Sequence, residues 1–169
     1  LILPDCFSNE EVNNLRKAMT TVFNEKTEAN IVEKSSGVVR TAMGLHLRSK
    51  IFDDLTRHPE FFEPASQIRG PNLYIQQTKI NVKAAFAGEV WQWHYDFATH
   101  SGEDGVPKPL ALNLHVFLDD VTEFNGPLFF IPKSHKYASA PSKLDTVTTN
   151  YPLWVVDQQT VKTLVKENG

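Results

Sequence analysis

The chain has 169 residues, of which 41% are hydrophobic and eleven are phenylalanine, so one domain with a buried core is expected. Its net charge of −3 comes from mixed acidic and basic residues without a lysine or arginine run, which argues against a nucleic-acid partner. No stretch approaches the roughly 20 apolar residues that cross a bilayer, and no signal-peptide pattern opens the chain. We therefore expect a cytoplasmic protein without a membrane partner.

The first predicted element is a helix. Ser8 and Glu11 have the spacing of a capping box, and Phe7 is placed to pack on Val12 as a hydrophobic staple. Residues 24–37 are polar and aperiodic and predict a loop. Two further helices are expected at residues 50–57 and 59–68, the second closed by Gly70. Residues 1–70 are thus expected to be a mainly helical scaffold. The apolar face that the first helix is expected to bury consists of Val12, Leu15, Met19 and Val22.

After Gly70 the pattern changes from helical to alternating. Residues 73–84 predict a strand, and the face that carries Gln77, Asn81 and Lys83 is unusually polar. That face is either a half-exposed sheet surface or the wall of a pocket. Further strands are predicted at residues 90–97, 110–118 and 128–131, and such short strands between turns favour a β-sandwich or barrel.

The C-terminal part is expected to complete this portion of the fold. Residues 139–150 predict a loop, and Asp157 is placed to cap a helix inserted at about residues 157–168. The predicted organisation is therefore a single domain, with a β-barrel portion at residues 71–169. The apolar stripe of the last helix is Val161, Leu164 and Val165.

His94 and Asp96 are the candidate metal ligands. Because the chain has a single cysteine, a metal must be held by histidine and carboxylate side chains. Two residues apart in a strand, His94 and Asp96 leave the same face and can grip one ion. Two histidines and one carboxylate with open positions suit non-haem iron(II). The triplet alone is a weak signal, because a histidine and an aspartate at this spacing also occur as a surface pair.

The surrounding sequence carries a resemblance to a known family. Residues 93–107 read W-H-Y-D-F-A-T-H-S-G-E-D-G-V-P, which resembles the signature segment of the ectoine hydroxylases, and residues 77–83 resemble the segment that precedes it. Residues 125–128 and 131–135 resemble the G-P-L…I-P-G-S-H signature of the wider phytanoyl-CoA dioxygenase superfamily, with Lys133 where glycine is usual. The resemblance implies a mainly β protein with flanking helices and a double-stranded β-helix (jelly-roll, cupin-like) core, incomplete at the C-terminus. It also implies iron(II), 2-oxoglutarate and O₂.

The resemblance assigns roles to particular residues. It makes His94 and Asp96 iron ligands, and Lys83 matches a residue that contacts 2-oxoglutarate, with Asn81 on the same predicted strand face. Gln77 matches a residue that contacts ectoine. The alternation of the strand agrees, because Gln77, Asn81 and Lys83 share one face. From its own sequence position, Lys83 can also be an ordinary solvated surface lysine.

The other histidines have several interpretations. His115 is expected either to line the pocket, as a cofactor contact, or to pack in the core. His135 lies in a tight turn and is expected to be structural rather than a ligand. His100 stands where the ectoine enzymes have a tryptophan that packs on ectoine, so we expect it to contact the substrate and to change which substrate is bound.

The resemblance implies a hydroxylase that acts on a small amino-acid-like zwitterion, ectoine or a related compound. Asp96 argues against the halogenases of the superfamily, which replace this carboxylate with a small residue. The alternative is a non-catalytic or differently metallated β-barrel that keeps the fold. We expect the second histidine ligand and a 2-oxoglutarate-binding arginine to lie beyond Gly169, and a homodimer is possible.

Overall fold

The computed structural model describes all residues except 1, 35, 87, 89, 138–140 and 149–151. Helix α1 (Asn9–Phe23) begins as predicted, with the Glu11 amide donating to Ser8 Oγ at 3.3 Å and the Ser8 amide donating to Glu11 Oε2 at 2.7 Å. This capping box satisfies two amides at the helix start. The Phe7 ring lies 6.0 Å from the ring of Phe61 in α4 (Pro59–Arg69), so it ties the N-terminal segment to that helix.

A three-stranded antiparallel sheet forms beside α1, in the order β1 (Asn30–Val32), β2 (Val39–Met43) and β3 (Lys79–Asn81). The prediction of a loop at residues 24–37 is wrong where β1 pairs with β2. The triplet Asn30–Val32 becomes a strand here because a neighbouring strand supplies its hydrogen-bond partners, which the mainly polar segment around it does not reveal. In the predicted strand at residues 73–84, only β3 is paired as a strand.

Short helices connect β2 to β3. They are α2 (Leu45–Arg48), α3 (Lys50–Thr56) and α4, and the two predicted helices are confirmed to within a residue or two. Gly70 ends α4 with a φ of 87°, which favours glycine. The apolar faces of α1, α2 and α3 meet β2 in the main core. The buried members of that core are Leu15, Val22, Ala42, Leu45 and Phe52.

Arg48 joins the elements of this half of the molecule. Its guanidinium donates to the carbonyls of Met43 and Val22 at 2.9 and 3.0 Å, and to Asn30 Oδ1 at 2.9 Å. Its Nε donates to Glu25 Oε2 at 2.9 Å. The single guanidinium group of Arg48 therefore supplies hydrogen-bond donors to acceptors at the end of α1, the start of β1 and the end of β2.

The second half of the chain contains α5 (Asp96–Gly102), a 3₁₀ turn (Ser134–Tyr137), β4 (Ser142–Asp145), β5 (Leu153–Val156) and α6 (Gln158–Asn168). The cap by Asp157 is confirmed, since its Oδ1 accepts from the Thr160 amide at 2.9 Å. Two predictions are wrong. The predicted strand at residues 90–97 is interrupted by α5, which begins at Asp96. Part of the predicted loop at residues 139–150 is β4, which pairs with β5. Residues 139, 140, 149 and 150 of that loop lie outside the described chain.

Residues 110–118 and 128–131 contain no assigned strand. Most of their large side chains are exposed; Phe129 and Phe130, for example, are 69% and 75% exposed, whereas Ile131 is buried. A strand requires a hydrogen-bonded neighbour, and within the described residues these segments have none. The described chain thus combines strands and helices without a closed barrel.

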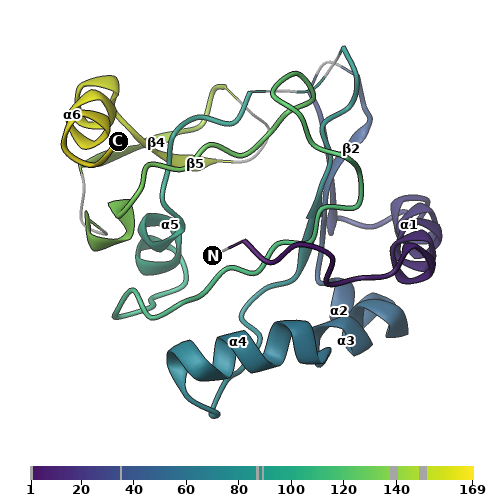
Figure 1. Cartoon of the computed structure of the whole chain (residues 1–169). Coiled ribbons are helices and arrows are strands. Elements are labelled where there is room, and N and C mark those ends of the chain that lie inside the picture. Colours follow the sequence, from purple (N-terminus) through teal and green to yellow (C-terminus); the bar gives the residue numbers. More distant parts are fainter. Residues whose placement is uncertain (1, 35, 87, 89, 138–140, 149–151) are drawn as a thin grey trace.

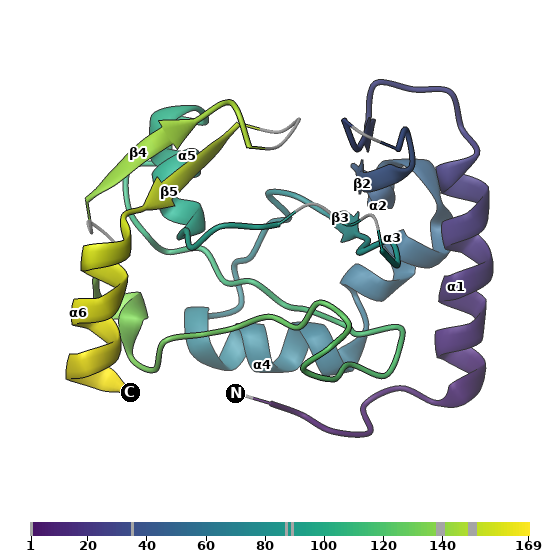
Figure 2. The ribbon, with the colours of Figure 1, turned by 90° about the horizontal axis from the view of Figure 1, so that it is seen from above.

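The two groups of elements lie at opposite ends of the molecule. In Figures 1 and 2, α1 and β2 mark one end and α6, β4 and β5 the other, while α4 runs along one edge between them. Helix α5 packs against β5. Among the described residues, none of the helices has the length and apolar character needed to span a membrane.

We expect Arg48→Met to lower the free energy of unfolding by about 3 kcal/mol, because partly buried carbonyls lose a charged donor. Urea denaturation measures this change. The matched control is Arg57→Met, because the exposed Arg57 side chain contacts Asp53 through an ion pair at 2.6 Å and a hydrogen bond to its carbonyl at 3.1 Å. Exposed contacts of this kind contribute little, so this variant should lose much less stability. Equal losses in the two variants would contradict the role given to Arg48.

We expect Asp145, the last residue of β4, to make the stability of the protein depend on pH in the acid range. Hydrogen bonds from Thr148 and from the amides of Thr148 and Val147 lower the pKa of Asp145 from 3.8 to about 2. Below pH 3.8 the unfolded chain takes up this proton first, so stability present above that pH is lost as the pH falls toward 2. We expect the urea midpoint of the wild type to fall more steeply over this range than that of Asp145→Asn. Parallel curves would show that Asp145 contributes nothing to acid sensitivity.

Candidate metal and substrate site

The candidate site is built where the segment before α5 meets β5. His94 forms an isolated antiparallel bridge with Val155, and the Val156 amide donates to the Trp93 carbonyl at 2.8 Å. Because β5 is paired along its length with β4, this contact fixes the backbone of His94 to a sheet. The site therefore rests on pairing between segments about 60 residues apart in the sequence.

The ring of His94 has a defined orientation. Its Nδ1 lies 2.7 Å from the Gln92 carbonyl oxygen, which can only accept, so Nδ1 carries the hydrogen. In the neutral ring the lone pair is then on Nε2, which lies 3.6 Å from Asp96 Oδ1. Two acceptors that face each other at this distance fit a cation between them, since a bound metal lies about 2.0–2.2 Å from each such ligand. A second nitrogen tied to a carbonyl is also the usual arrangement of a metal-binding histidine.

Asp96 is held from two directions. It is the first residue of α5, where the positive end of the helix dipole favours a carboxylate. Its Oδ2 accepts a hydrogen bond from Asn113 Nδ2, which leaves Oδ1 toward His94. Nothing in the local sequence predicts this role of Asn113, because it lies 17 residues from Asp96 and the two meet only in the folded chain.

His94 and Asp96 line a small cleft that is partly open to solvent. The cleft brings together four predicted site residues: Gln77, His94, Asp96 and His100. The cleft also contains four residues that were not predicted from the sequence: Lys79, Trp91, Thr99 and Leu153. The alternation that marked Gln77 could have identified Lys79, because both lie on the same predicted strand face.

The ring of Trp91 packs against the guanidinium group of Arg40. The guanidinium carbon of Arg40, a residue of β2 that is only 1% exposed, lies 3.9 Å from the centroid of the Trp91 ring. The ring centroid of Trp91 is 6.2 Å from that of His94. A buried cation–π contact thus supports the aromatic wall of the cleft.

His100 reaches the cleft from the last turn of α5. Its Nδ1 lies 2.8 Å from Asp104 Oδ2 and 3.0 Å from Gln76 Nε2. Its side chain is 14% exposed. The imidazole is therefore held on one edge by polar groups outside the cleft.

Asn81 and Lys83 are not among the lining residues of this cleft. Asn81 Oδ1 accepts from Thr41 Oγ1 at 3.0 Å on the neighbouring strand. The aliphatic part of Lys83 packs on Gly126, where a Cβ would lie 2.7 Å from Lys83 Cγ. With a φ of 81° as well, position 126 requires glycine.

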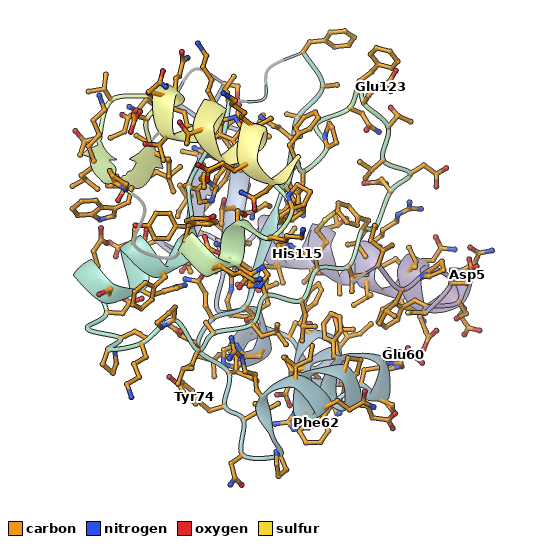
Figure 3. The ribbon with its side chains drawn as sticks, turned by 60° about the vertical axis from the view of Figure 1, so that its left-hand side comes forward. Asp5, Glu60, Phe62, Tyr74, His115 and Glu123 are labelled. Atoms are coloured by element: carbon orange, nitrogen blue, oxygen red, sulfur yellow. The ribbon has the colours of Figure 1, made fainter. Side chains whose placement is uncertain are left out.

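His115 lies near the cleft without lining it, and Figure 3 shows it in the middle of the molecule. Burial lowers the pKa of His115, Asp96 opposes this shift and Lys79 adds to it. These electrostatic interactions place His115 within range of both groups. The residues that the structure describes contain no cluster of three or more histidine, cysteine or acidic side chains able to hold a metal, so neither His115 nor His135 completes such a set.

The sequence pattern of the phytanoyl-CoA dioxygenase (PhyH) family matches residues 1–166. The chain belongs to this family.

Curated relatives in this family carry related names. The chain is 39% identical over 134 residues to an L-proline trans-4-hydroxylase from Streptomyces griseoviridis, covering 79% of this chain and 50% of that protein. It is 37% identical over 140 residues to an ectoine dioxygenase from Bordetella parapertussis, covering 80% of this chain and 46% of the relative. The chain thus spans about half the length of the curated relatives that it matches.

The fold also has a solved counterpart. The apo structure of EctD from S. alaskensis superimposes with a TM-score of 0.83 and 30% identity, over all of this chain and 58% of that one. EctD has also been solved with 2-oxoglutarate and 5-hydroxyectoine, and with bound Fe. The arrangement of strands and helices described above is therefore that of a PhyH-family protein.

We expect Asn113→Ala to weaken Co²⁺ binding about 10- to 100-fold, because the Asp96 carboxylate loses the group that orients it. Absorbance titration of the protein with Co²⁺ measures the change. Asn81→Ala is the matched control, since Asn81 bonds Thr41 outside the cleft. Unchanged affinity in Asn113→Ala would show that Asn113 does not orient a ligand.

Proposed function

We propose that this chain forms the iron- and cosubstrate-binding part of an iron(II)/2-oxoglutarate-dependent dioxygenase that hydroxylates a small amino-acid-like zwitterion. The observation that carries the proposal is the pair of acceptors His94 Nε2 and Asp96 Oδ1, 3.6 Å apart beside a cleft. Iron(II) in such a site would supply the activation of O₂. The names of the relatives, a proline hydroxylase and ectoine dioxygenases, support the reaction class.

Within this proposal, different side chains in and around the cleft bind the iron, the substrate and 2-oxoglutarate. His94 and Asp96 would bind the iron, while Gln77 and His100 would contact the substrate. Asn81, Lys83 and His115 stay proposed contacts of 2-oxoglutarate. We add Lys79, because it lines the cleft and a fixed ammonium group suits a dianionic cosubstrate.

The proposal extends to the fold, the cellular location and the oligomeric state of the protein. We propose that the strands belong to a double-stranded β-helix, supported by the superposition on EctD. A cytoplasmic location is supported by the single cysteine, which is typical of reduced compartments. A homodimer stays a prediction.

We expect anaerobic addition of Fe(II) and 2-oxoglutarate to the full-length protein to produce a visible charge-transfer band. The band reports chelation of iron by the cosubstrate, so Asp96→Ala should abolish it. Glu103→Ala is the matched control, because Glu103 is an exposed acid near the cleft that is not among its lining residues. A wild type that binds metal but shows no band would instead favour a differently metallated, non-catalytic protein.

A further inference from the structure

Asp104 fixes the imidazole of His100 from outside the cleft. His100 Nδ1 lies 2.8 Å from Asp104 Oδ2. A carboxylate can only accept, so Nδ1 must carry the hydrogen. Gln76 Nε2 lies 3.0 Å from His100 Nδ1 and 3.4 Å from the same Asp104 oxygen. Because His100 Nδ1 and Gln76 Nε2 both carry hydrogen in this arrangement, Gln76 donates to the Asp104 carboxylate and not to the ring.

This contact determines what the ring offers to a ligand. With Nδ1–H given to Asp104, the neutral imidazole has a single remaining polar atom, the lone pair on Nε2. His100 lines the cleft together with Gln77 and Lys79, whereas Asp104 does not line it. His100 would therefore offer an acceptor to a substrate in the cleft, whose lining also includes a cation and an amide that can bind a carboxylate.

We propose that Asp104 is a positioning residue for substrate specificity. By holding His100 as the Nδ1–H tautomer, it makes Nε2 an acceptor for an N–H of the substrate ammonium group. The substrate class is then an amino or imino acid that keeps at least one N–H, and a fully N-methylated analogue is rejected. This inference rests on the proposed function.

The experiment compares L-proline with N,N-dimethyl-L-proline as substrates of the full-length protein, with succinate release as the readout. In wild type, kcat/KM should favour L-proline. Asp104→Leu should reduce this preference about 10- to 100-fold, the loss expected when a hydrogen bond to a charged group is removed. Because Asp104 is not a lining residue, the variant tests the hydrogen bond rather than the size of the cleft.

Three further variants separate specificity from folding. Asp104→Asn should keep most of the preference, because its amide oxygen still accepts from Nδ1–H. Glu103→Leu, the adjacent exposed acid, should leave the preference unchanged. His100→Phe should lose it, and combining it with Asp104→Leu should change nothing more if Asp104 acts through His100.

A second readout does not depend on turnover. ¹⁵N NMR of the imidazole should show Nδ1 protonated and Nε2 unprotonated in wild type, with this tautomer lost in Asp104→Leu. Two protonated nitrogens in wild type, or turnover with the same preference in Asp104→Leu, would overturn this inference alone. Absence of turnover with any amino acid would overturn the proposed function and this inference with it.

Discussion

The backbone contact between residues 93–94 and β5 is the constraint on which the site depends. The Val156 amide donates to Trp93 at 2.8 Å, and His94 pairs with Val155. The chain turns into α5 only two residues later, so the strand-like and helical segments share one anchored junction. Without that anchor, the imidazole and the carboxylate would sit on a loop that no sheet holds, and a metal site needs its ligands fixed in advance.

Around this junction the polar groups act in a consistent way. Gln92 orients His94, Asn113 orients Asp96, and Asp104 orients His100. Each partner bonds one polar atom of the side chain and leaves the other polar atom for a ligand. The orientation of these three lining side chains therefore depends on hydrogen bonds from Gln92, Asn113 and Asp104, which do not line the cleft.

The sequence predicts those parts of the molecule that depend on local chemistry. The cap at Ser8, the stop at Gly70 and the cap at Asp157 set helix ends through residues a few positions away. The spacing of His94 and Asp96 predicts that their side chains meet, and they do lie 3.6 Å apart, although Asp96 begins a helix and does not continue a strand. By contrast, β1 becomes a strand only through pairing with β2, and Asn113 meets Asp96 only after folding. Alternation places Gln77, Asn81 and Lys83 on one face, but of these three only Gln77 lines the cleft. Asn81 instead bonds Thr41 on β2, and Lys83 packs on Gly126.

The central claim is that His94 and Asp96 bind one metal ion through Nε2 and Oδ1. Anomalous diffraction at the iron edge, from crystals of the full-length protein grown anaerobically with Fe(II), tests it most directly. We predict a single strong peak about 2.0–2.3 Å from both atoms, with His94 Nδ1 still bonded to the Gln92 carbonyl. A peak elsewhere, or iron bound through Nδ1 of His94, would contradict it.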